Sequence, residues 1–333
     1  MGGRGCAAAV VKTARRDAGF DPSGTGEYNP AMSAPPTAAS RRRGLAILAL
    51  ILCAALWSLN GPLIKLLDRQ HVPALTIACY RSLLGGLVFA AFARRRLDTL
   101  RNVAPAWPIA AVLTFTLMTA SFVIANTLTS AANAIILQYT SPIWVFLLSP
   151  LLLRERPGRV EGLVLLVAMA GVGVIFAGGR GADLTGLLVA LSSGLGYGTL
   201  TVLLRKLRPV SPVVVAAANA LGSGLLLIVP VAVWGRFGLT AYQWELMLVL
   251  ALVQFTAPYV LFSWALQRIE AYRAALIVLL EAVLNPLWTY LIVHEAPAPA
   301  TLLGGPLILA GVAGWLLLAW RRERRVRPTP NTS

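Results

Sequence analysis

Glu281 is the acidic side chain that the sequence places well inside a long apolar segment, which runs from residue 274 to 293. A charge at the centre of a bilayer costs at least about 2.5 to 3.5 kcal/mol, so it persists only with a partner or a purpose. Removal from water favours the protonated form of a carboxyl group, which suits proton binding and release. Two interpretations stay open: a proton-coupling residue, or a structural carboxyl paired with Arg81 or with a helix hydroxyl.

Two basic side chains also fall within apolar segments. Arg81 lies about two turns into the segment 74–93. Its forked donors can clamp the carboxylate of a substrate, or they can tie two helices together or reach the membrane surface. Lys65 lies near the outer end of the first segment, where we expect its long side chain to reach the interface.

Uncharged polar and aromatic side chains cluster near two prolines. One cluster precedes Pro142, and the other is Asn60-Gly61-Pro62, where the proline frees a backbone carbonyl. The second feature is either a simple kink or an opened helix that offers polar groups to a ligand. The expected lining of a central cavity is Trp57, Asn60, Arg81, Gln138, Tyr139, Tyr197, Gln254, Tyr259 and Trp264.

The elements that must position these residues are membrane-spanning helices. The chain is 57% hydrophobic and 13% charged, with a mean hydropathy of +0.73, and a spanning helix needs about 20 mainly apolar residues. The apolar runs are continuous rather than alternating, which favours helices over barrel strands. Ten segments qualify: 44–66, 74–93, 107–127, 131–153, 160–178, 185–204, 210–234, 243–267, 274–293 and 301–320.

The chain matches itself at an offset of 140 residues without a gap. Phe115-Thr116 recurs as Phe255-Thr256, and Glu155-x-Pro157 recurs as Glu295-x-Pro297. Trp57 pairs with Tyr197 at the same offset, and Lys65 with Arg205. An odd number of helices per half turns the second half over. We therefore expect an all-α integral membrane protein with ten transmembrane helices as two inverted five-helix repeats.

The net charge of +16 reflects topology rather than nucleic-acid binding. Basic residues gather in every second loop and in the C-terminal tail, whereas the alternate loops carry Arg69, Arg180 and Arg236. This is the positive-inside pattern. It predicts a multi-pass protein of the cell (inner) membrane with both termini in the cytoplasm.

The sequence resembles the EamA family of the drug/metabolite transporter superfamily. The resemblance rests on Trp57 to Lys65, on Arg81, on Tyr139-Thr140-Ser141-Pro142, and on the two Glu-x-Pro motifs. It covers nearly everything from residue 44 to 320. This chain has Ala282 where the family pattern usually has proline, which leaves the local helix geometry open. The resemblance implies transport of amino acids, sugars, nucleoside-like metabolites or drugs.

The predicted organisation has four parts. They are a disordered extension (1–43), a first repeat (44–178), a second repeat (185–320) and a basic cytoplasmic tail (321–333). Met32 reads like a natural start, so residues 1–31 fit a start codon assigned too early. Glycines in the fifth and tenth segments predict that these helices pack together or form a homodimer.

Three function classes compete. The duplication and the polar cluster favour a secondary transporter, most simply an exporter, of small metabolites such as amino acids or drugs. It would work by alternating access, with Glu281 in proton coupling and with small-molecule substrate and lipid bilayer as partners. A passive channel or facilitator is the alternative. An intramembrane enzyme is disfavoured because no catalytic constellation, metal spacing or phosphate-binding loop appears, so we expect no cofactor.

Overall fold

A computed structural model describes residues 38–153, 159–178, 182–266, 268, 274 and 277–326. The chain divides into two compact units, residues 1–45 and Ala46–Ser333, and the described part of the first is the start of one helix. The predicted extension before residue 38, the Glu155-x-Pro157 motif and the tail from residue 327 lie outside the described residues.

Regular structure is helical throughout the part of the chain that the structure describes. A lipid-embedded backbone must satisfy its own polar groups, and a helix does so within one segment. The described elements include one 3₁₀ helix, η2, and one π-helix, η3. In chain order they are α2 (Ala38–Ser58), α3 (Asn60–Arg69), α4 (Ala74–Ala93), η2 (Arg94–Asn102), α5 (Ala106–Leu128), α6 (Ala131–Gln138), α7 (Ser141–Leu153), α8 (Arg159–Gly178), α9 (Ala182–Lys206), α10 (Pro212–Trp234), α11 (Ala241–Leu248), η3 (Val249–Thr256), α12 (Ala257–Leu266), α14 (Leu280–Val293) and α15 (Pro299–Val326).

The ten predicted segments each coincide with helical structure. Within the described residues, eight helices are long and apolar enough to cross a membrane. The fifth and ninth predicted segments appear as shorter apolar helices, Leu165–Gly178 and Leu280–Val293. The prediction of an all-α integral membrane fold is confirmed.

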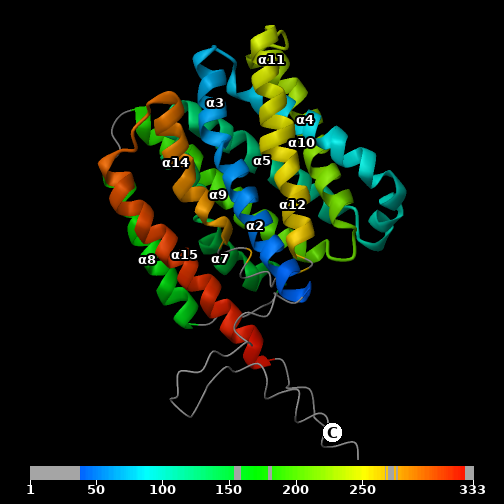
Figure 1. Ribbon diagram of the computed structural model, residues 1–333, viewed down its shortest axis with the longest axis vertical. Helices are drawn as coiled ribbons and strands as arrows, with labels where there is room; N and C mark the ends of the chain where they lie inside the picture. The colour runs from blue at the N-terminus through cyan, green and yellow to red at the C-terminus, as the bar shows by residue number, and fades with distance from the viewer. Residues whose placement is uncertain are drawn as a thin grey trace, which may run out of the picture. The chain divides into compact units, whose positions relative to one another are not determined.

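The main contacts between helices of the first repeat and helices of the second have counterparts in which the two repeats are interchanged. A two-fold relation between the repeats requires this. The packing of α5 on α9 has its counterpart in the packing of α3 on α11 and η3. The packing of α6 and α7 on α9 is matched by α14 on α3, and that of α5 on α10 by η3 on α4. The second helices of the repeats, α4 and α10, pack on each other, as do the fifth, α8 and α15 (Figure 1).

Glycines of both helices lie in the contact between α8 and α15. A Cβ added to Gly171 would lie 2.5 Å from the Gly304 carbonyl oxygen, and a Cβ on Gly304 would lie 2.5 Å from that of Gly171. Small residues allow this approach where lipid gives helices no hydrophobic drive to associate. The first alternative of the sequence analysis, that these helices pack together, is confirmed.

The largest apolar core draws on both halves of the chain. Ile64, Phe122 and Ile135 of the first half are fully or almost fully buried with Leu187 and Met247 of the second. The site described next therefore sits among helices that are packed across the repeats.

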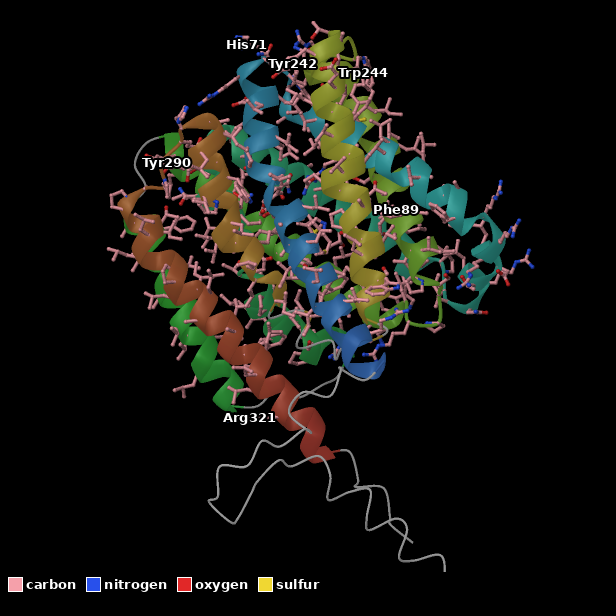
Figure 2. All side chains as sticks on the ribbon, viewed as in Figure 1. His71, Phe89, Tyr242, Trp244, Tyr290 and Arg321 are labelled. Carbon is pink, nitrogen blue, oxygen red and sulfur yellow. The ribbon has the colours of Figure 1, made fainter. Side chains whose placement is uncertain are left out.

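Some of the labelled side chains mark the two ends of the helices. His71 and Arg321 lie at opposite ends, and Tyr242 and Trp244 lie at the same end as His71 (Figure 2). We call these ends the His71 end and the Arg321 end.

Candidate functional site

Glu281 and Tyr139 join the two repeats near the break between α6 and α7. Pro142 removes one backbone donor, and α6 ends at Gln138 while α7 begins at Ser141. Tyr139 occupies the break, with its hydroxyl 2.9 Å from Glu281 Oε2. Glu281 lies in the first turn of α14 and is 9% exposed. The carboxyl thus pairs with a hydroxyl, as one of the two structural alternatives anticipated.

Two further tyrosines surround this pair. Tyr197 of α9 and Tyr259 of α12 lie within electrostatic range of Glu281 and of each other. Tyr197 is 40% exposed, although Glu281 is buried. Cys53 of α2 lies within the same range. The structure therefore brings three predicted site tyrosines and the predicted proton-coupling residue into one cluster, which we call the tyrosine cluster.

Trp57 closes one side of the tyrosine cluster. Its ring lies 5.3 Å from that of Tyr259 in an edge-to-face arrangement and 5.6 Å from that of Phe262. Such pairs contribute about 0.5–1.5 kcal/mol beyond the burial of their area. Trp57 and Tyr259, predicted separately from their depth and neighbours, are in direct contact.

Arg81 is buried, at 4% exposure, and its partners are neutral. Nη1 donates to Asn60 Oδ1 at 3.1 Å, and Nη2 donates to the hydroxyl of Thr119. The guanidinium carbon lies 5.4 Å from the centre of the Phe255 ring. Nε has no partner among the described residues, and none of the described carboxylates forms an ion pair with it. Arg81 therefore ties α4 to α3 and α5, and its Nε is left without a partner.

The first transmembrane helix, called helix 1 below, is interrupted at Leu59 between α2 and α3. Two side-chain amides of the second repeat donate to backbone carbonyls at this break. Pro62 cannot donate to the carbonyl of Ser58 four residues earlier, and Asn285 Nδ2 donates to that carbonyl at 3.1 Å. Gln254 Nε2 donates to the neighbouring carbonyl of Trp57, also at 3.1 Å. Helix 1 is therefore interrupted, and the two carbonyls beside the interruption accept donors from the protein, which favours the simple kink over an opening that offers these groups to a ligand.

The segment that carries Gln254 has its own irregularity. Gln254 belongs to η3, a π-helix, and the hydroxyl of Thr256 donates to the carbonyl of Ala251 five residues earlier, at 2.7 Å. Single turns of π-helix occur frequently at functional sites. The wider turn places Gln254 so that its amide nitrogen meets helix 1. Its Oε1 is buried and has no partner in the described part of the chain.

Two predicted site residues have no described polar or ring contact with the tyrosine cluster. Trp264 stacks on Arg268, whose guanidinium carbon is 4.1 Å from the ring centre, near the end of α12. Gln138 ends α6 and is half-buried. No hydrogen bond or ring contact between described residues joins either side chain to Tyr139, Tyr197 or Tyr259.

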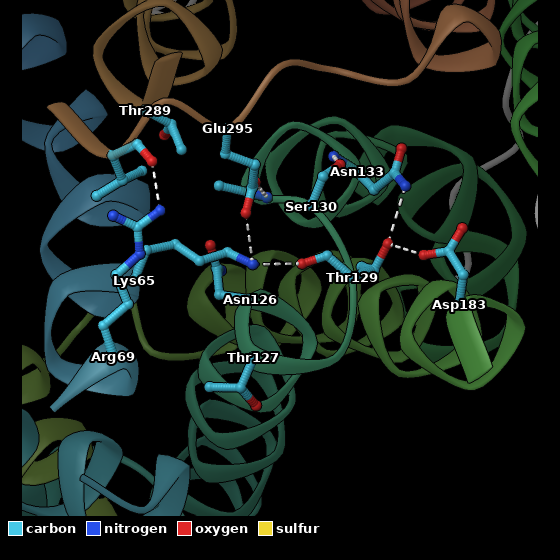
Figure 3. A network of polar contacts seen from close by, with 12 residues as sticks. Lys65, Arg69, Asn126, Thr127, Thr129, Ser130, Asn133, Asp183, Thr289 and Glu295 are labelled. Carbon is cyan, nitrogen blue, oxygen red and sulfur yellow. Dashed lines mark hydrogen bonds and ion pairs between the residues drawn. The ribbon is translucent and has the colours of Figure 1, made fainter. Parts of the chain in front are cut away.

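A second polar assembly lies close to the His71 end, and Figure 3 shows it. Lys65 Nζ lies 2.8 Å from Glu295 Oε2 and donates to the Thr129 carbonyl at 2.9 Å. Asn133 donates to the Thr129 hydroxyl at 2.9 Å and accepts from the hydroxyl of Thr301. The Lys65 side chain is 13% exposed. The Lys65 ammonium thus lies near the His71 end and forms an ion pair with Glu295, a partner that the sequence did not predict.

This assembly, which we call the Lys65 network, places charges at helix ends. The Thr129 carbonyl stands at the C-terminal end of α5, where a cation is favoured. Glu295 Oε1 accepts from the backbone N–H of Ala131, the first residue of α6, at 2.8 Å. The Thr129 hydroxyl donates to Asp183 in the first turn of α9. Elements of both repeats are thereby tied together.

Sequence reasoning missed Thr119 and Glu295 as members of these assemblies, and it noted Asn285 only as a polar residue of the ninth segment. Pro62 carried a usable signal for Asn285, because a freed carbonyl inside a membrane requires a donor. Nothing in the sequence singled out Thr119.

Among the described residues, no group of three or more His, Cys, Asp or Glu side chains is arranged to hold a metal ion.

Comparison with known proteins gives relatives that match most of the chain. The model of the EamA-like transporter family matches residues 44–177 and 184–317. An uncharacterized transporter from Archaeoglobus fulgidus is 34% identical over 209 residues, which are 62% of this chain and 73% of the relative. The uncharacterized transporter YvbV of Bacillus subtilis is 28% identical over 266 residues, 76% of this chain and 85% of the relative.

A solved crystal structure shares the fold. Its TM-score is 0.58 at 22% identity, and the match covers 84% of this chain and 99% of that one. Fold, repeats and relatives together define a multi-pass membrane transporter. The chain belongs to the EamA-like transporter family.

Proposed function

We propose that the protein is a secondary transporter that exports small metabolites such as amino acids or drugs. Alternating access through a central cavity between the inverted repeats would move the substrate, and Glu281 would carry a proton in the opposite direction. The observation that carries the proposal is the contact of Glu281 with Tyr139. It places an acid of the second repeat against a hydroxyl of the first, where a change of protonation acts on the boundary between the repeats.

The exposure of Tyr197 supports the same assignment. Tyr197 is 40% exposed although its neighbours Glu281 and Tyr139 are buried or half-buried. A partly exposed tyrosine near a buried carboxyl is the arrangement that a cavity between the repeats would give. Tyr139, Tyr197, Tyr259 and Trp57 would hold the substrate through hydroxyls and aromatic faces. The unused Nε of Arg81 would attract an anionic group.

The Lys65 network supports a conformation that is closed at one end. It ties α3, the α5–α6 turn, α9 and the segment before α15 together near the His71 end. The positive-inside pattern assigns this end to the outside of the cell (inner) membrane and both termini to the cytoplasm. Opening to the outside would then require the Lys65–Glu295 ion pair to separate.

Flux in proteoliposomes tests the proposal. Purified protein would be supplied with a panel of amino acids and amines, with and without a pH gradient. We expect saturable flux with counterflow that the pH gradient accelerates. Glu281→Gln, which removes the titrating group but keeps the size, should abolish the acceleration. Glu245→Gln, which alters an exposed carboxyl of α11, is the matched control and should behave like the wild type.

Three results would count against the proposal. Flux that does not saturate would assign the protein to channels. Saturable flux with no effect of the gradient would make it a facilitator. An unchanged pH dependence in Glu281→Gln would remove this carboxyl from proton coupling.

A further inference from the structure

One face of α14 holds a row of buried residues at intervals of four. They are Glu281, Asn285, Thr289 and Val293. Residues four apart lie above one another on a helix. Glu281 accepts from Tyr139, Asn285 donates to Ser58, and the Val293 carbonyl accepts from Arg69. Three of these four residues therefore bind the first repeat.

Asn285 is the member that meets a defect in the backbone of helix 1. The residue is fully buried, at 0% exposure, and its Nδ2 serves the Ser58 carbonyl that Pro62 leaves without a helical donor. A Cβ added to Gly61 would lie 2.6 Å from Asn285 Oδ1. Glycine at position 61 therefore lets the amide reach the broken backbone. An unsatisfied carbonyl in this apolar setting is costly, so the amide is a requirement of the break.

We propose that Asn285 is a positioning residue, whose amide replaces the backbone donor that Pro62 removes and fixes the break of helix 1 against α14. Asn60 and Trp57 lie on the two sides of this break. Asn60 binds Arg81 and Trp57 contacts Tyr259. A displacement of α14 that follows a change at Glu281 would move the break and both of these side chains. This functional part rests on the proposed function, whereas the hydrogen-bond replacement does not.

A double-mutant cycle tests the replacement. In Pro62→Ala the new backbone N–H can serve the Ser58 carbonyl, so Asn285 becomes dispensable for stability. We expect Asn285→Ala to lower the melting temperature in detergent by about 3–8 °C when Pro62 is present. In the Pro62→Ala background the loss should fall to less than half of that. Thr289→Val, on the same face but bonded only within its own helix, is the control and should show equal effects in both backgrounds.

Transport rates separate positioning from simple stabilisation. Pro62→Ala should melt at or above the wild-type temperature yet transport at least about tenfold more slowly in proteoliposomes, because the break is lost. The double variant should regain stability without regaining flux.

Each contrary outcome has a distinct meaning. Equal melting losses in both backgrounds would overturn the replacement. Wild-type flux in the double variant would overturn positioning. If Asn285→Ala yields no folded protein, the double variant must fold, and its failure would overturn the inference. Wild-type protein without any flux would refute the proposed function and still leave the melting cycle to decide the replacement.

Discussion

Helix 1 and helix 6 occupy equivalent places in the two repeats and are built in opposite ways. Helix 1 is broken at Leu59 into α2 and α3, whereas helix 6 is the continuous α9. The repeat equivalent of Pro62 is Val202, which keeps its backbone donor, and the equivalent of Asn285 is Val145. Where one repeat has a break and an amide that fills it, the other has neither.

Helix 6 contacts α7, and helix 1 contacts α14, in different ways. In the second repeat, Gly198 lies against α7 so closely that a Cβ would be 2.6 Å from the Ser141 carbonyl oxygen. Its equivalent in helix 1 is Ser58, whose carbonyl accepts from Asn285. Glycine packing thus does in one repeat what a side-chain hydrogen bond does in the other. The duplication preserved the fold and let the polar groups collect around helix 1.

We expect the largest effect from a proline in helix 6, at the position equivalent to Pro62 of helix 1. Val202→Pro removes a backbone bond and leaves the Gly198 carbonyl without a donor, in a helix where Val202 is 1% exposed. We expect a loss of about 3 kcal/mol or more in the free energy of unfolding, measured by thermal melting in detergent. Adding Val145→Asn, which copies Asn285, should restore about 1 kcal/mol. A Val202→Pro protein that melts like the wild type would show that helix 6 tolerates the same break.

We expect a smaller effect when Gly198 of helix 6 is replaced by serine, the residue at the equivalent position 58 of helix 1. Gly198→Ser should destabilise the protein by about 1–2 kcal/mol, because its Cβ would meet the backbone of α7. Gly173→Ser is the control, since nothing lies within 4 Å of a Cβ at that position. It should melt at the wild-type temperature or slightly above, as serine is a better helix former than glycine. Equal losses in both variants would refute close packing as the cause.

We expect the smallest effect from the Lys65–Glu295 ion pair at the His71 end. Lys65→Met, Glu295→Gln and the double variant form a cycle whose coupling free energy should be about 1 kcal/mol, since the pair is mostly but not fully buried. Melting in detergent at low and high salt would measure it. Arg95→Met, which removes an exposed charge from η2, should be nearly neutral. A coupling near zero would mean that the hydrogen bonds of Glu295 to Ala131 and of Lys65 to Thr129 hold this end without the ion pair.

The sequence was sufficient for the helices because its signals are local. Apolar length and continuity located all ten segments, and the offset between Phe115 and Phe255 revealed the repeats. The break in helix 1 was also foreseeable, because a proline removes its own donor wherever it stands. Ala282 left the geometry of the ninth predicted segment open, and α14 proves continuous through this position and through Pro286.

The partners of the site residues were beyond sequence reasoning because they are set by packing. Glu281 was recognised from depth alone, yet its hydrogen bond to Tyr139 joins residues 142 positions apart. Arg81 was weighed as a clamp for a carboxylate, and its contacts with Asn60 and Thr119 depend on how α3, α4 and α5 meet. Trp264 shares its helix with Tyr259 but stacks on Arg268. Depth and polarity say that a residue matters, whereas they do not say what it touches.

The hydrogen bonds at the break of helix 1 can form only after the second repeat has been synthesised. Ser58 and its amide donor are 227 residues apart, and Trp57 and its donor are 197 apart. A ribosome adds about 5–20 residues per second, so the first transmembrane segment waits about 10–45 seconds for Asn285 to be synthesised. During that interval the Ser58 carbonyl must rely on water or on the insertion machinery. The first helix to enter the bilayer is therefore among the last to be completed.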